Sequence, residues 1–291
     1  MKVLRLSSVF WFVLKHAVLL AAALLCFVPL MLIVSASFTD QDAIAQYGYT
    51  LFPTEFSTYA YQYILLDSRS VIQAYGVTIF VTIVGSLTGL LVMSLLAYAL
   101  SRPHLRLRKT LSFYVLFTLL FYGGLVPTYI VISQILGLKN NILVLILPIM
   151  VVPTYVLILR TYFAALPEEL MDAAKIDGAG EWRIFFQIVF PLSTPAFATV
   201  GLLCALMYWN DWFLSLLYID DQGLYSLQYL LYRLMSSIQY LQVNTQTAPV
   251  SVPASPARMA LAVLAIGPII FAALFAQKYF VRGITLGALR D

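Results

Sequence analysis

Asp211 is the one carboxylate that the sequence places inside a long apolar stretch, where it follows Asn210. An ionisable side chain in such surroundings is costly to bury, so it is a functional candidate. One interpretation gives Asp211 a hydrogen bond to a solute hydroxyl or a place on a translocation path. The other makes it a hydrogen-bond partner between helices. The rings of Tyr208, Trp209 and Trp212 also allow two interpretations, stacking on a solute ring or anchoring a helix at a membrane surface.

A second group of polar side chains forms the acidic segment from Leu166 to Gly178. Pro167 suits the first position of a helix, because its missing N–H needs no partner there. Glu168 and Glu169 would then face the positive end of the helix dipole, and Gly178 would close the helix in a left-handed conformation. The segment therefore predicts a capped helix of about ten residues.

Helical spacing gathers small and apolar side chains on one face of this predicted helix. The face comprises Leu166, Leu170, Ala173, Ala174 and Asp177. Its alanines make it thin enough for close contact with another surface. One interpretation is a docking element for a cytoplasmic partner, and the other is a loop helix that rests on the membrane surface. A second amphipathic run follows, and it is expected to turn Trp182, Phe185, Phe186 and Val189 toward the membrane.

The sequence lacks the motifs that would give the chain a catalytic centre of its own. It has no Gly-x-x-x-x-Gly-Lys-Ser/Thr run to hold ATP phosphates, and no Gly-x-Ser-x-Gly or His-Glu-x-x-His motif. His16 and His104 flank apolar stretches and are interpreted as surface residues. Cys26 and Cys204 lie within apolar runs and cannot build a disulfide framework or a zinc site. We expect no catalytic residue, metal or cofactor here, so energy must come from another chain or an ion gradient.

The amino-acid composition indicates what class of protein holds these residues in place. Of the 291 residues, 62% are hydrophobic and only 10% are charged, and the mean hydropathy is +0.91. A soluble domain carries about 25% charged and about 45–50% apolar residues. A soluble globule, a disordered chain and a nucleic-acid-binding domain are therefore excluded in favour of a membrane protein.

Six apolar stretches reach the length of about 20 residues that a helix needs to cross a membrane. They are Ala17–Phe38, Val71–Leu100, Leu111–Leu136, Asn141–Phe163, about Thr194–Tyr218 and about Ala257–Val281. Backbone groups in lipid must be bonded within their own segment, so these stretches are expected to be helices. We therefore predict an all-α membrane protein with six transmembrane helices and a cytoplasmic coupling helix, forming a single domain over residues 1–291.

The first stretch is too long for the core of a cleaved signal peptide, which is about 7–15 residues. We expect a retained helix that is preceded by an amphipathic elbow around Val9–Leu14. Within the later stretches, Gly123-Gly124 followed by Pro127 predicts a kink. Further breaks are expected at Pro148, Pro153 and Pro268.

Lysine and arginine set the expected orientation of the chain. With both termini in the cytoplasm, most basic residues fall inside, including the cluster Arg102–Lys109. Residues 164–191 then form a cytoplasmic loop, and residues 39–70 and 219–256 form extracellular loops. This topology explains the net charge of +4 without a nucleic-acid partner.

The cytoplasmic loop resembles the EAA loop of ABC importer permeases. The resemblance rests on Asp172-Ala173-Ala174, Gly178, Ile188 and Pro191 at the spacing of that pattern. Asp172 replaces a glutamate and Phe190 replaces a leucine, so the chemical type is kept at both departures. The run from Ala173 to Ala179, the run from Trp209 to Phe213 and the C-terminal run from Gln277 to Gly283 are similar to maltose-type carbohydrate importers, in particular the branch that imports oligosaccharides and alginate.

The resemblance implies a type I importer permease in the cytoplasmic (inner) membrane of a prokaryote. Such a subunit pairs with a second homologous permease, most often as a heterodimer, and with two ATPase subunits that bind ATP and Mg. A sugar-binding protein outside the cell delivers the substrate and contacts the loop at 219–256. The helix carried over as Glu169–Gly178 would sit in a cleft of the ATPase. Its coupling residues would be Glu169, Asp172, Ala173, Ala174, Asp177 and Gly178.

Two other classes of protein compete with this interpretation. An ion-coupled secondary transporter of a small polar solute would place several charged residues at mid-membrane and show repeated halves, whereas this chain offers Asp211 and no evident repeat. A membrane transferase would need clustered acids or a metal site. For an importer, the substrate path would include Asn210, Asp211, Trp209, Trp212 and Tyr208. The resemblance favours an oligosaccharide, including an acidic one such as alginate, over a monosaccharide.

Overall fold

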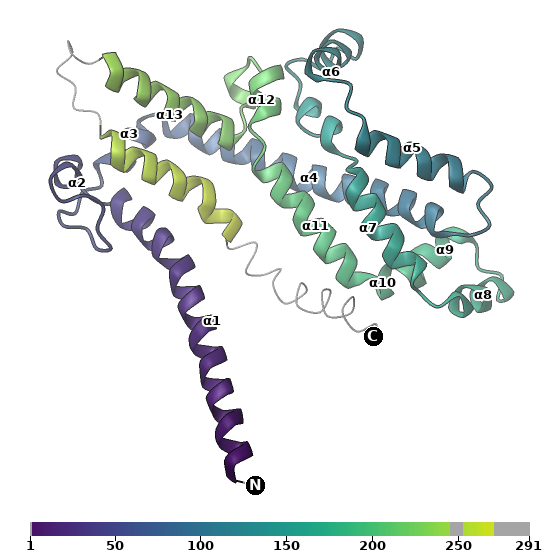
Figure 1. Cartoon of the computed structure of the whole chain (residues 1–291). Helices are drawn as coiled ribbons and strands as arrows, with labels where there is room; N and C mark the ends of the chain where they lie inside the picture. The colour runs from purple at the N-terminus through teal and green to yellow at the C-terminus, as the bar shows by residue number, and fades with distance from the viewer. Residues whose placement is uncertain (1, 245–252, 271–291) are drawn as a thin grey trace. The chain divides into compact units, whose positions relative to one another are not determined.

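The computed structural model describes residues 2–244 and 253–270, which are helices and connecting segments apart from one antiparallel bridge between Thr39 and Phe56 (Figure 1). The predicted all-α class is confirmed. The chain divides into two compact units. Unit 1 comprises Met1–Ser68 and Leu231–Gly267, and unit 2 comprises Arg69–Leu230 and Pro268–Asp291.

Unit 1 begins with one long N-terminal helix, most of whose described side chains are exposed. Its elements are α1 (Lys2–Ser37), α2 (Gln41–Tyr47), α3 (Tyr59–Ile64), η1 (Leu65–Asp67), most of α13 (Leu227–Asn244) and most of the helix Ala254–Ile270. The helix α1 runs without a break through Val9–Leu14, so the predicted elbow is wrong. Its end is anchored by a hydrogen bond of 2.9 Å between the hydroxyls of Ser37 and Tyr61. Next to it the Phe38 ring stacks on Phe56 at 5.6 Å.

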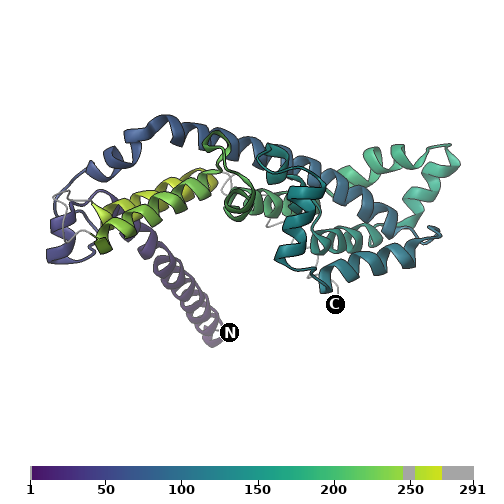
Figure 2. The ribbon, with the colours of Figure 1, turned by 90° about the horizontal axis from the view of Figure 1, so that it is seen from above.

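Unit 2 contains most of α4 (Ser68–Ser101), which is its longest helix (Figure 2). The other elements are α5 (Arg108–Leu120), α6 (Leu125–Ile130), η2 (Val131–Ile135), η3 (Ile142–Leu145), η4 (Leu147–Ile149), α7 (Pro153–Ala164), α8 (Glu168–Ile176), α9 (Glu181–Ile184), η5 (Phe185–Val189), α10 (Phe190–Leu192), α11 (Thr194–Trp209), α12 (Phe213–Tyr218) and η6 (Gln222–Leu224).

Among the described residues, two straight helices are long and apolar enough to cross a membrane, and three bent pairs raise this to as many as five. The straight ones are Trp11–Ser37 and Arg69–Ser101. The bent pairs are Arg108–Leu120 with Leu125–Ile135 at 112°, Ile142–Ile149 with Pro153–Ala164 at 51°, and Glu181–Leu192 with Thr194–Trp209 at 84°. The first two bends lie within the third and fourth predicted spans, where the sequence predicted a kink at Gly123-Gly124 and breaks at Pro148 and Pro153.

Glycine and proline account for the first two breaks. Gly124 has φ +94°, a left-handed conformation that favours glycine, and it directly precedes α6, so the predicted kink is confirmed. Pro148 and Pro153 lie at the starts of η4 and α7, where their missing N–H groups are tolerated. Pro268 lies within the described helix Ala254–Ile270 without interrupting it. The predicted continuation of this last span to Val281 lies outside the described residues.

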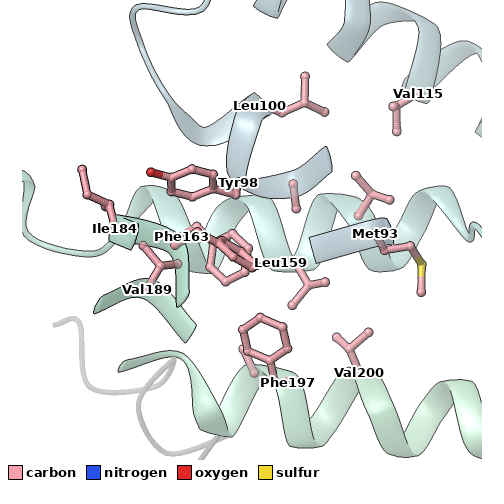
Figure 3. Packing of buried hydrophobic residues seen from close by; sticks show 14 of the residues in the cluster. Met93, Tyr98, Leu100, Val115, Leu159, Phe163, Ile184, Val189, Phe197 and Val200 are labelled. Atoms are coloured by element: carbon pink, nitrogen blue, oxygen red, sulfur yellow. The ribbon is translucent and has the colours of Figure 1, made fainter. Parts of the chain in front are cut away.

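Two apolar clusters in unit 2 pack along different halves of α4. Around its second half, Met93 and Leu100 pack with Leu159 and Phe163 of α7 and with Val200 of α11 (Figure 3). The other cluster is formed by Val77, Val81, Val144, Leu145, Tyr208 and Tyr218, with further residues of the segments at 129–149 and 207–229. A single continuous helix thus connects two separately packed regions.

Candidate functional site

The helix α8 (Glu168–Ile176) is the predicted coupling helix, and it carries Glu168 and Glu169 in its first turn and Lys175 in its last. Each charge has the sign that stabilises its end of the helix dipole. Pro167 immediately precedes the helix instead of occupying its first position, because its ψ of 126° is extended. The helix is accordingly nine residues long instead of about ten.

Gly178 ends α8 as predicted, with φ +78°. Its N–H donates to the carbonyl of Lys175 at 3.0 Å, and the N–H of Ala179 reaches back to the carbonyl of Ala174 at 2.9 Å. These two bonds form a Schellman motif, which satisfies carbonyls that the helix end would otherwise leave unpaired. The small residues Ala174 and Ala179 pack against the core beneath this turn.

The faces of α8 differ from the expected pattern. Met171 is 2% exposed and packs in the core cluster, and Leu166 and Ala174 pack against the same cluster. Leu170 and Ala173 lie on the exposed side, together with Ile176, which is 86% exposed. The predicted single face is therefore divided, because the helix is anchored through Met171. The exposed side also carries Glu169, Asp172 and Asp177.

The residues that follow α8 are also divided between buried and exposed side chains. Phe185 and Val189 are buried in the core cluster, so their predicted position toward the membrane is wrong. Trp182 and Phe186 are exposed and their rings stack with centroids 6.2 Å apart. The five residues Phe185–Val189 form a π-helical turn.

Two side chains at the end of α4, Tyr98 and Arg102, connect this helix to α8 and α9, which lie near that end in Figure 1. The hydroxyl of Tyr98 donates to Glu181 Oε2 at 2.5 Å, and the guanidinium of Arg102 lies 4.5 Å from the centre of the Tyr98 ring. The same guanidinium donates to the sulfur of Met171. A pocket of about 500 Å³ adjoins these residues and is also lined by Leu95, Ala99 and Phe185.

Asp211 lies beyond the end of α11, which corrects the predicted helical position. The fifth predicted span ends at Trp209, and α12 begins only at Phe213. The Asp211 carboxylate accepts a hydrogen bond of 3.3 Å from the backbone N–H of Leu214, and its carbonyl accepts one of 3.0 Å from the hydroxyl of Ser226. Asp211 is partly buried in a turn that its own side chain helps to close.

The aromatic and amide candidates around Asp211 have different surroundings. Tyr208 is buried, and its hydroxyl donates to the carbonyl of Ile146 at 2.9 Å. Trp209 is also buried, whereas Asn210 and Trp212 are exposed. A path that runs past this turn would therefore meet Asn210 and Trp212 before it met the two buried rings.

Two connecting segments of unit 2 are held together by Asn140 and Lys139. Asn140 has φ +59°, and its Oδ1 accepts hydrogen bonds from the backbone N–H groups of Asp220 and Asp221 at 3.1 and 2.8 Å. Lys139 forms an ion pair with Asp220 at 2.9 Å, and this hydrogen bond raises the pKa of the lysine. The segment that follows α12 is thus fixed to the loop that precedes η3. In the described part of the chain, no group of three His, Cys, Asp or Glu residues could hold a metal ion.

Comparison with protein families gives a match to the binding-protein-dependent transport system inner membrane component over residues 82–286. The chain belongs to this family. As an ABC importer permease it is a non-enzymatic membrane component, and the ATPase activity of such systems resides in partner subunits. Membership decides between the classes that the sequence left open, in favour of the importer and against the ion-coupled transporter.

Related permeases are similar in sequence to this protein over nearly the whole chain. The polygalacturonan/rhamnogalacturonan transport system permease protein YtcP of Bacillus subtilis is 36% identical and covers 94% of this chain and 96% of its own. The arabinooligosaccharides transport system permease protein AraQ of Halalkalibacterium halodurans is 29% identical over 90% of both. A solved bacterial ABC transporter involved in the import of the acidic polysaccharide alginate contains a chain that is 29% identical, with a TM-score of 0.78 and coverage of 92% of this chain and 96% of that one.

Sequence reasoning did not find the contacts that support α8 in this permease. Tyr98 lies within a long apolar run, and it is 83 residues from Glu181 in the chain. Arg102 was noted only as part of the basic cluster that sets the membrane orientation. The available signal was the spacing of Tyr98 and Arg102, which places both on one side of a helix at its end.

Proposed function

We propose that this permease imports oligosaccharides derived from acidic polysaccharides. Two related proteins support this substrate class: one is named for polygalacturonan and rhamnogalacturonan, and the other belongs to a transporter for alginate. The substrates named for these two relatives are polymers that carry carboxylates. In this proposal the substrate path passes the turn at Asp211, with Asn210 and Trp212 at its surface and the buried Tyr208 and Trp209 behind them.

The exposed side of α8 is proposed to be the contact with the ATPase. The observation that supports this role is the exposure of large apolar side chains on that side. Ile176 and Leu170 are large apolar side chains that remain exposed there, which is typical of a surface that a partner covers. Glu169, Asp172, Ala173 and Asp177 would complete the contact, while Ala174 and Gly178 shape the helix end. Closure of the ATPase pair would then move α8 and shift the permease between two arrangements.

The proposed assembly contains four kinds of subunit around the lipid membrane. A second homologous permease forms a heterodimer with this chain, two ATPase subunits bind ATP and Mg, and an extracellular or periplasmic sugar-binding protein docks on the outer loop at 219–256. Both termini lie in the cytoplasm, and residues 1–291 act as one transmembrane permease domain.

A cross-linking experiment tests the contact with the ATPase. In a chain with Cys26 and Cys204 replaced by serine, Ile176→Cys and Ala173→Cys are each expected to cross-link to the ATPase subunit in intact cells. Tyr49→Cys is the matched control, because Tyr49 is also exposed but lies in the loop at 39–70. Failure of both α8 variants to capture the ATPase, with or without ATP, would contradict the proposed role of α8.

Uptake measurements test the substrate class separately. Cells that carry the transporter are expected to accumulate labelled galacturonate or alginate oligomers and to lose this uptake when the gene is deleted. Neutral oligomers of equal length are the matched control. Uptake of the neutral oligomers alone would overturn the acidic substrate while leaving the permease role in place.

A further inference from the structure

Tyr98 lies at the meeting point of two polar connections from α4 to the segment that contains α8. Its hydroxyl donates to Glu181 at the start of α9, and Glu181 forms an ion pair of 3.5 Å with Lys175 in the last turn of α8. Figure 3 shows the hydroxyl end of the Tyr98 ring directed toward Ile184, which also belongs to α9. This first connection therefore ends on the C-terminal turn of α8.

The second connection uses the face of the same ring. Arg102 lies over the Tyr98 ring at 4.5 Å, a distance at which a cation is attracted to the aromatic face. The other side of the guanidinium contacts the sulfur of Met171, which is the buried residue of α8. Two routes that begin at one tyrosine thus reach α8 at its middle and at its end.

Apolar packing beneath α8 is sparse, so these directional contacts have a large share in setting its orientation. Met171 is the one residue of the helix that is fully buried, with Ala174 packed beside it. The pocket of about 500 Å³ lies next to the contacts and is lined by Tyr98, Arg102, Met171 and Glu181 themselves. A helix with space beside it can tilt, and its hydrogen bonds to α4 then determine how far α4 follows the tilt.

We propose that Tyr98 is a positioning residue that links α4 to α8, by holding Glu181 with its hydroxyl and Arg102 with its ring. The inference rests on the proposed contact between α8 and the ATPase. Through Tyr98, a displacement of α8 would be transmitted along α4, which connects both apolar clusters of unit 2. Without this link, the ATPase could still bind and hydrolyse ATP but would move α4 less effectively.

The test compares Tyr98→Phe with the unchanged protein in the full transporter, reconstituted in proteoliposomes with its partner permease, ATPase and binding protein. The variant loses only the hydroxyl and keeps the ring beneath Arg102. A hydrogen bond to a charged group is strong enough for its loss to lower the number of substrate molecules transported per ATP by about tenfold. ATP hydrolysis itself should stay within about twofold of the unchanged protein.

Tyr61→Phe is the matched control, since it removes a tyrosine hydroxyl that is bonded to Ser37 in unit 1, far from α8 in the sequence. Its ratio of transport to hydrolysis should not change. Glu181→Ala removes the acceptor from an exposed position and should reproduce the effect of Tyr98→Phe. The double variant should be no worse than Glu181→Ala alone, because both changes break the same bond.

The outcomes distinguish a failure of this inference from a failure of the proposed function. Failure of both Ile176→Cys and Ala173→Cys to cross-link to the ATPase, in a chain with Tyr98 intact, would contradict the ATPase contact itself. A retained cross-link with an unchanged ratio in Tyr98→Phe, or with two losses that multiply in the double variant, would overturn only the role of Tyr98. If Tyr98→Phe fails to assemble, Glu181→Ala decides the question, and an unchanged ratio in that variant overturns the proposal.

Discussion

Gly85 shows how closely single residues are fitted near the middle of α4. A Cβ at this position would lie 2.5 Å from Cζ of the Tyr208 ring, a distance that real Cβ atoms essentially never show. Gly89, one turn further along, would bring a Cβ to 2.7 Å from the carbonyl oxygen of Met150. The two glycines therefore allow the backbone of α4 to approach α11 and the segment after η4, as small residues do where membrane helices pack closely.

Gly85→Val is expected to destabilise the permease by about 1–3 kcal/mol, because the added side chain must displace the buried Tyr208 ring. Thermal unfolding of the purified protein in detergent measures this effect. Gly76→Val is the matched control on the same helix, since a Cβ at Gly76 meets no atom within 4 Å. Equal melting temperatures for the two variants would show that the Tyr208 ring moves aside without cost.

The elements show where sequence reasoning succeeds and where it fails. Helical caps are local, so Gly178 and the acidic first turn of α8 predicted the helix with nearly correct bounds. The kink at Gly124 was predictable for the same reason. Mean hydropathy identifies apolar stretches but not the breaks within them, and the fifth span was therefore predicted to continue past Trp209. The link between Tyr98 and Glu181 depends on tertiary packing, which no local pattern reports.

Gly178→Ala tests whether the C-terminal cap of α8 supports the proposed contact with the ATPase. A left-handed φ of +78° costs alanine about 1–2 kcal/mol, although no neighbouring atom lies within 4 Å to obstruct its Cβ. The last turn of α8 should therefore fray, and cross-linking from Ile176→Cys to the ATPase should weaken. Gly180→Ala is the control, because Gly180 has an ordinary φ of −74° and the same open surroundings. An equal cross-linking yield in both variants would contradict a role for the cap.

At the scale of the whole molecule, α4 is the element that relates the two candidate sites of unit 2. Its first half packs with the cluster that contains Tyr208, close in sequence to Asp211, and its second half ends at Tyr98 and Arg102 beside α8. Because α4 is continuous over 34 residues, a displacement at its Tyr98 end would reach both clusters in the proposed coupling. The three bent pairs are interrupted instead, and we expect rearrangement to occur at their breaks.

Asp211→Asn tests whether this arrangement includes a substrate path at the turn after α11. Asparagine keeps an oxygen that can accept the hydrogen bond from the Leu214 N–H, so the turn and the assembly should persist while the negative charge is lost. If Asp211 lines the path, uptake of oligomers should fall by about tenfold. Asp40→Asn is the matched control, because the partly buried Asp40 side chain closes a similar turn by accepting from the Asp42 N–H at 3.0 Å. Normal uptake by Asp211→Asn in an intact transporter would assign this carboxylate to the structure of the turn alone.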